Sequence, residues 1–163
     1  MNSKSIVLIG MPGCGKSTLG EILSKKLEYD FIDMDIFIEE YSGSKISDLF
    51  KISEEHFRNI ETEVCEILGK TNRTVIASGG GIVKKKENID YLKDSIIIYI
   101  DRDLDNILSD INVENRPLLK DDKLRLFSLY KDRHHLYNKY ADFIVENNET
   151  IESTLKNIIK ILE

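Results

Sequence analysis

Short apolar runs recur along the chain, and segments with a different spacing of apolar residues lie between them. Each run is bounded by polar residues and is short enough to suit a strand buried in a parallel sheet. Such a pattern indicates a series of strands rather than one continuous helical array. The five strands predicted in this way are Ile6–Ile9, Phe31–Asp33, Thr74–Ser78, Ser95–Ile100 and Asp142–Val145.

Between the runs, apolar residues recur at helical spacing. Residues 19–27, 57–68 and 151–162 show this most clearly, and Gly69 suits the C-terminal cap of the second of these helices. Alternating strands and helices predict an α/β layer fold with a parallel sheet. Because ligands of such sheets bind at the carboxyl ends of the strands, we expect the chemistry in the residues that follow each strand.

The segment between the first strand and the first helix fits the phosphate-loop pattern G-x-x-x-x-G-K-[ST]. It reads Gly-Met-Pro-Gly-Cys-Gly-Lys-Ser-Thr over residues 10–18. Glycines let backbone N–H groups converge on phosphate oxygens, Lys16 would reach the β- and γ-phosphates, and the Ser17 hydroxyl would bind Mg²⁺. The alternative is a chance glycine-rich turn, but a strand and a helix flank the motif as a phosphate site requires. The motif therefore predicts a site for a nucleoside triphosphate with magnesium.

Length and composition restrict the class of protein. The 163 residues, of which 41% are hydrophobic, suit one domain with its own core. A net charge of −6 argues against a general nucleic-acid-binding protein, which would need a basic face. Because no apolar stretch could span a bilayer and no signal-peptide pattern is present, we expect a cytoplasmic protein that binds no membrane. Cys14 and Cys65 do not make a disulfide framework, and Cys14 is interpreted as a small residue that fits the loop.

Two aspartates come at the end of the second predicted strand. In an extended strand, Asp33 and Asp35 point to the same face. Beside a triphosphate, one carboxylate can hold magnesium, usually through water, while the other orients or deprotonates an attacking hydroxyl. The alternative is a solvated loop with an N-capping aspartate, and Asp35 is compatible with both interpretations.

Glycines and arginines supply further candidates. Residues 79–81 are three glycines directly after the third strand, which suits either a close approach of backbone to a ligand or a tight turn. Only six of the 23 basic residues are arginine, the side chain that forms planar forks for anions. Arg58 lies one helical turn before Glu61, which would hold the guanidinium unless the two form a solvated pair. Arg133 lies on the helix before the last strand.

Residues 110–123 show neither the apolar spacing of a strand nor that of a helix. Arg116-Pro117 disfavours a helix through the middle of this segment. A long irregular stretch in a compact domain is often a lid, although an ordinary surface loop is the alternative. A phosphotransferase has to exclude water from its site. We therefore predict a lid over about residues 110–123.

In their order and spacing, these motifs resemble the shikimate kinase family over essentially the whole chain. The resemblance implies a three-layer P-loop kinase fold like that of adenylate kinase, with a five-stranded parallel sheet of order 2-3-1-4-5. It implies one domain over residues 1–163, with a substrate-binding helical region at about residues 34–62, and we expect a monomer. The segments that carry the resemblance are residues 10–18, Phe31-x-Asp33-x-Asp35, Ser44–Phe50, Phe57-Arg-x-x-Glu61, Gly79-Gly-Gly, Arg116-Pro-Leu-Leu and Arg133-x-x-x-Tyr137.

The same resemblance implies an activity and a site for the acceptor. Family members transfer the γ-phosphoryl group of ATP to the 3-hydroxyl of shikimate, in aromatic amino-acid biosynthesis. On the matching positions, Asp35 would hold shikimate hydroxyls and act as the base or orienter. Arg58 and Arg133 would bind the shikimate carboxylate, and Gly80 and Gly81 would contact shikimate or phosphate through their backbone. Arginine forks for a carboxylate and an aspartate for hydroxyls fit this small acid.

The resemblance also assigns the nucleotide site. Lys16 and Arg116, the latter reaching the phosphates from the lid, would join Asp35 as catalytic residues. Ser17 and Asp33 would hold Mg²⁺. The residues expected to contact ATP are Gly13, Cys14, Gly15, Lys16, Ser17, Thr18 and Arg116.

Two positions depart from the family pattern. Family members commonly carry an arginine that stacks on adenine about seven residues before the lid arginine, and Ser109 stands near that position here. His134 and His135 stand where a proline is usual. Because adjacent residues cannot share a helix face, we interpret these histidines as surface or rim residues.

Two other functions deserve comparison. A related small-molecule kinase, such as a gluconate kinase, shares the fold and the phosphate loop, but the arginine and aspartate set favours the carboxylated cyclohexene. A nucleotide-dependent switch would need Asn-Lys-x-Asp for guanine. Here Asn138-Lys-Tyr-Ala is followed by Asp142, so the aspartate comes one place late.

Overall fold

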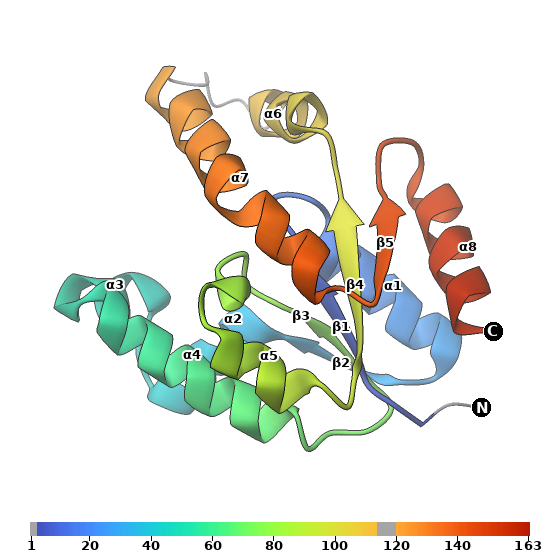
Figure 1. Ribbon diagram of the computed structural model, residues 1–163, viewed down its shortest axis with the longest axis horizontal. Helices are drawn as coiled ribbons and strands as arrows, with labels where there is room; N and C mark the ends of the chain where they lie inside the picture. The colour runs from blue at the N-terminus through green and yellow to red at the C-terminus, as the bar shows by residue number, and fades with distance from the viewer. Residues whose placement is uncertain (1–2, 114–119) are drawn as a thin grey trace.

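A five-stranded parallel sheet of order β2-β3-β1-β4-β5 forms the centre of the molecule (Figure 1). The computed structural model describes residues 3–113 and 120–163. It confirms the predicted α/β class and strand order, and each strand begins and ends within one residue of its prediction. The strands are β1 (Ile6–Ile9), β2 (Asp30–Asp33), β3 (Thr74–Ala77), β4 (Ile96–Asp101) and β5 (Phe143–Glu146).

The central strands are apolar because both faces of the sheet are covered. Every residue of β1 and β3 is buried. Val7 of β1 pairs with Ile76 on one side and with Ile97 on the other. Burial of each such side chain stabilises the fold by about 1.5–3 kcal/mol. These strands therefore give rigid support to the loops at their carboxyl ends.

Helices cover the sheet on both faces (Figure 1). Helices α1 and α8 contact each other on one face, α4, α5 and α7 lie on the other, and α2 and α3 pack against α4 at one end. In the part of the chain that the structure describes, no helix is long and apolar enough to cross a membrane. The helices are α1 (Lys16–Leu27), α2 (Met34–Ser42), α3 (Ile46–Ile52), α4 (Glu54–Leu68), α5 (Lys86–Leu92), α6 (Leu104–Val113), α7 (Lys120–Tyr140) and α8 (Ile151–Leu162), with a 3₁₀ turn η1 at Ile82–Lys84.

Helix α4 has well-defined ends. The Ser53 hydroxyl caps its N-terminus by accepting the N–H of His56 at 3.0 Å. Gly69 follows its last residue, as predicted, with φ of −62° rather than a left-handed conformation. Glycine is needed there for a different reason, because a Cβ atom would collide with the carbonyl of Tyr91.

The segment predicted to be irregular, residues 110–123, is helical at both ends. Helix α6 continues to Val113 and α7 begins at Lys120, so this part of the prediction is wrong. Asp110, Ile111 and residues 121–125 are exposed, and exposed helical turns carry no burial pattern from which to predict them. Residues 114–119, with Arg116, lie outside the described residues, and the lid remains a prediction.

Candidate active site

The phosphate loop joins β1 to α1 in a conformation that requires glycine. Gly10 and Gly15 have φ of 149° and 103°, which L side chains rarely adopt. A Cβ atom at Gly10 would lie 2.6 Å from the carbonyl oxygen of Ile100 and 2.8 Å from Sγ of Cys14. The loop therefore lies directly on the end of β4. Cys14 is buried within the loop, as expected of a small residue that fits there.

Lys16 is held inside the phosphate loop. Its Nζ donates to the carbonyl oxygens of Gly10 at 2.8 Å and Met11 at 2.9 Å, and it lies 3.7 Å from Sγ of Cys14. The side chain is buried. Phosphate oxygens would offer this ammonium a charged acceptor, which makes a stronger hydrogen bond than a neutral carbonyl does.

Ser17 and Asp33, the two predicted magnesium ligands, are in direct contact. The Ser17 hydroxyl donates to Oδ2 of Asp33 at 2.7 Å. The other carboxylate oxygen, Oδ1, caps α2 by accepting the N–H groups of Asp35 at 3.0 Å and Ile36 at 3.3 Å. A hydroxyl and a carboxylate fit Mg²⁺, which prefers hard oxygen ligands and usually keeps its waters and substrate phosphates. Residues 3–113 and 120–163 contain no group of three or more His, Cys, Asp or Glu side chains that could hold a metal ion.

The cap corrects the predicted relation between the two aspartates. Asp33 ends β2, and Asp35 lies in the first turn of α2, so they do not share a strand face. The N-capping aspartate is Asp33 rather than Asp35. An N-cap lets the chain turn directly from strand to helix, and this turn places Asp35 in the wall of the cleft described below.

Asp35 faces the first glycine after β3. A Cβ atom at Gly79 would lie 3.1 Å from Oδ1 of Asp35 and 3.7 Å from Oε2 of Glu61. Desolvation by the surrounding protein and then the negative charge of Asp33 raise the pKa of Asp35, whereas Lys16 and Arg58 oppose that shift. A carboxylate with a raised pKa is a better proton acceptor at neutral pH.

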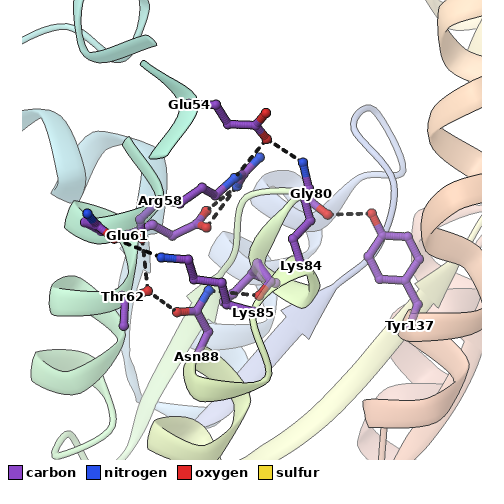
Figure 2. A network of polar contacts seen from close by, with 11 residues as sticks. Glu54, Arg58, Glu61, Thr62, Gly80, Lys84, Lys85, Asn88 and Tyr137 are labelled. Atoms are coloured by element: carbon purple, nitrogen blue, oxygen red, sulfur yellow. Dashed lines mark hydrogen bonds and ion pairs between the residues drawn. The ribbon is translucent and has the colours of Figure 1, made fainter. Parts of the chain in front are cut away.

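Arg58 and Glu61 form a buried pair on α4 (Figure 2). Nη1 of Arg58 donates to both carboxylate oxygens of Glu61, at 2.9 and 3.1 Å. Their side chains are only 9% and 1% exposed, so the alternative of a solvated pair is wrong. Burial raises the pKa of Glu61, and the charge of Arg58 opposes this.

The Arg58 guanidinium is further fixed from three sides. It lies against Gly81, where a Cβ atom would collide with it, and its Cζ is 5.0 Å from the centre of the Phe57 ring. Its Nε is 3.5 Å from Oε1 of Glu54, and Lys84 of η1 also pairs with that carboxylate (Figure 2). The group is therefore positioned before any ligand is bound.

Helix α7 brings a second arginine to the same glycines. The Tyr137 hydroxyl donates to the Gly80 carbonyl at 2.6 Å (Figure 2), and burial raises the pKa of Tyr137 to about 12. A Cβ atom at Gly80 would lie 2.9 Å from Pro12 of the phosphate loop and 3.2 Å from Nη1 of Arg133. Arg133 and Arg58 therefore reach neighbouring glycines of one turn.

A cleft of about 650 Å³ runs along the carboxyl ends of the strands. Arg58, Gly81 and Arg133 lie beside its Gly80 end rather than in its lining, and Cys14 is buried within the phosphate loop. Arg116 lies outside the described residues. The predicted site residues that line the cleft are Gly13, Gly15, Lys16, Ser17, Thr18, Asp35 and Gly80.

Two residues of this region had no predicted role. Asn147, after β5, donates its amide to the Cys14 carbonyl at 2.8 Å and accepts the Thr154 hydroxyl at 2.9 Å, which supports the phosphate loop. Arg102, after β4, lines the cleft. Both follow a strand directly, so the rule that places ligands at strand ends could have identified them.

The two histidines differ in their surroundings. His135 is exposed, as expected of a surface residue. His134 is half-buried, with its ring stacked 4.6 Å from that of Tyr130 and its Nδ1 3.3 Å from the Tyr99 hydroxyl. Through these contacts it packs α7 against β4.

Comparison with known proteins identifies relatives along the whole chain. A family model described as "Shikimate kinase" matches residues 12–163. A protein named shikimate kinase from Clostridium botulinum (strain Alaska E43 / Type E3) is 51% identical over 158 residues, which cover 96% of each chain. Among solved structures, shikimate kinase from Acinetobacter baumannii in complex with shikimate superposes with a TM-score of 0.88 at 30% identity, over 98% of this chain and 93% of that one. Shikimate kinase from Aquifex aeolicus superposes with a TM-score of 0.82 at 32% identity, over 97% of this chain and 95% of that one.

Proposed function

This chain belongs to the shikimate kinase family and catalyses the ATP-dependent phosphorylation of shikimate in aromatic amino-acid biosynthesis. We propose that the 3-hydroxyl of shikimate is the acceptor and that the reaction takes place in the cleft at the strand ends. The observation that carries the assignment is the convergence on one glycine turn, residues 79–81. Asp35 faces Gly79, Arg133 reaches Gly80, and Arg58 lies on Gly81. Pro12 of the phosphate loop touches the same turn, so a donor and an acceptor site adjoin there.

The phosphate loop binds the donor. Lys16 exchanges its carbonyl partners for oxygens of the β- and γ-phosphates and stabilises the charge that develops during transfer. Ser17 and Asp33 would hold Mg²⁺, which would neutralise the phosphate charge. Arg116 would reach the phosphates from the lid, and this role rests on the family resemblance alone.

Asp35 acts on the acceptor. Its carboxylate accepts a hydrogen bond from the 3-hydroxyl, orients the oxygen toward the γ-phosphorus and takes the proton as the hydroxyl attacks. The new bond joins the shikimate oxygen to phosphorus, while the bond from the γ-phosphorus to the β,γ-bridging oxygen breaks and ADP leaves. The raised pKa of Asp35 suits this acceptance of a proton.

Arg58 and Arg133 hold the carboxylate end of the acceptor. Glu61 fixes Arg58 through two hydrogen bonds, so little side-chain freedom remains to be lost when an anion binds. Gly80 adjoins Arg133 and Gly81 adjoins Arg58, and the backbone of these glycines contacts the acceptor directly.

The proposal extends to the setting of the enzyme. We expect an active monomer. The net charge of −6 opposes nucleic-acid binding. We place the enzyme in the cytoplasm, without a membrane partner.

Changing either carboxylate-binding arginine to lysine tests the acceptor site. Arg58→Lys and Arg133→Lys are each expected to raise the KM for shikimate roughly ten- to a hundredfold, because a charge-assisted hydrogen bond contributes about 1.5–3 kcal/mol and lysine lacks the planar fork. The KM for ATP should hardly change. Steady-state kinetics measures both constants.

Arg125→Lys is the matched control, since Arg125 lies on the exposed face of α7. It should leave both KM values unchanged. If the Arg58 and Arg133 variants kept the wild-type KM for shikimate, or if Arg125→Lys matched their effect, the placement of the acceptor beside residues 79–81 would be wrong.

A further inference from the structure

The order of the strands divides the cleft into two halves. The phosphate loop follows the central strand β1, and the acceptor residues, apart from Arg133 of α7, follow β2 and β3 on one side of it. On the other side, the cleft is lined by residues that follow β4 and β5 or lie on α6 and α8. Because the acceptor is placed on the β2 and β3 side, the nucleoside of the donor has to lie on the β4 and β5 side.

Arg102 supplies the charged group of this second half. It follows β4 directly, and its Nη2 pairs with Oδ2 of Asp110 on α6 at 2.8 Å. The Arg102 side chain is 21% exposed, whereas that of Asp110 is 60% exposed. Its Nε–H is buried and has no hydrogen-bond partner within residues 3–113 and 120–163. The ion pair therefore holds the guanidinium at the cleft wall while one of its donors remains unpaired.

Apolar side chains line the same half of the cleft as Arg102. Ile107 and Ile111 come from α6 and Ile151 begins α8. Ile111 and Ile151 are 37% and 40% exposed, so their apolar surface is open to a ligand. Ser109 adds nothing here, because its hydroxyl donates back to the Asp105 carbonyl at 2.8 Å. A planar guanidinium can stack on an aromatic ring, and the isoleucines of the same half of the cleft offer apolar surface that a ring would cover and a phosphate would not.

We propose that Arg102 binds the adenine base of ATP with the face of its guanidinium, and that Asp110 is the positioning residue that holds it there. This inference rests on the proposed function, since it needs the phosphates in the loop beside it. The apolar wall of the three isoleucines covers the rest of the ring. Adenine binding would then depend on a residue at the end of β4 rather than on an arginine of α6.

The test compares two ligands that share the phosphate site, namely ADP with Mg²⁺ and inorganic triphosphate with Mg²⁺, by calorimetric titration of the 163-residue chain. Arg102→Ala should raise the Kd of ADP roughly five- to thirtyfold, the range for a cation–π contact between exposed and desolvated limits. The Kd of triphosphate, which has no base, should stay within twofold. Arg102→Lys should restore little of the ADP affinity, because lysine keeps the charge but not the planar face. Asp110→Asn should raise the Kd of ADP by a smaller factor.

Separate controls distinguish failure of this inference from failure of the proposed function. Arg125→Ala removes an exposed arginine and should change neither Kd. Lys16→Ala should weaken both ligands; if it weakened neither, the phosphate site itself would be misplaced. If Lys16→Ala acted as expected but Arg102→Ala left ADP binding unchanged, or weakened ADP and triphosphate equally, Arg102 would not contact the base and the inference would be overturned.

Discussion

Lys16→Ala is expected to lower kcat for phosphoryl transfer more than a hundredfold while the protein keeps its fold. The ammonium acts on charge that grows as the phosphoryl group moves, so its loss falls mainly on the transition state, at a cost of more than about 2.7 kcal/mol. The carbonyls of Gly10 and Met11 would lose a donor, a loss confined to the phosphate loop. Turnover at saturating ATP and shikimate, with circular dichroism on the same sample, provides the measurement.

Lys25→Ala on the same helix is a suitable control. Lys25 is exposed and pairs only with Glu21 among the described side chains, at 2.9 Å. It should retain wild-type kcat. A Lys16→Ala enzyme that kept more than about a tenth of wild-type kcat, a loss of only ~1.4 kcal/mol, would contradict the assigned role.

Asp35→Asn is expected to lower kcat by roughly 10²- to 10⁴-fold and to leave ADP binding nearly intact. The amide keeps the shape of the side chain but cannot take the proton. The wild-type rate should also fall as the pH drops through the raised pKa of Asp35, because the protonated carboxyl cannot act as a base. This loss should begin at a higher pH than for an ordinary aspartate. The residual activity of Asp35→Asn should lack that decline.

Asp33→Asn should behave differently, because Asp33 has another task. An asparagine oxygen can still accept the N–H groups of Asp35 and Ile36, so α2 should keep its cap. The lost negative charge should instead raise the magnesium concentration needed for half-maximal rate. Identical magnesium titrations for the Asp33 and Asp35 variants would contradict this division of labour.

The features that could be predicted from sequence are those that depend on local pattern. The buried strands β1 and β3 read as apolar runs because both of their faces are covered. The phosphate loop was identified because its glycines and Lys16 have fixed spacing within a strand–loop–helix unit. In contrast, the relation between Asp33 and Asp35 was mispredicted, since the N-cap starts a helix where the strand pattern indicated further extension.

Features that depend on contacts between distant residues could not be predicted in this way. The burial of Arg58 depends on Gly81 and on the neighbouring rings, and the position of Arg133 depends on the packing of α7 against Gly80. Asn147 supports the loop across 133 positions of sequence. No periodicity in one segment encodes such pairs, although the rule that ligands lie at strand ends selects the right edge of the sheet.

The measurement that tests the central claim most directly is the rate of ADP formation from ATP and Mg²⁺ with four acceptor conditions: shikimate, gluconate, quinate and none. The account predicts sustained turnover with shikimate, whose carboxylate would meet Arg58 and Arg133 while its 3-hydroxyl reaches Asp35. The other three conditions should give a background rate. Turnover with gluconate equal to that with shikimate, or ADP formation that needs no acceptor, would contradict the account.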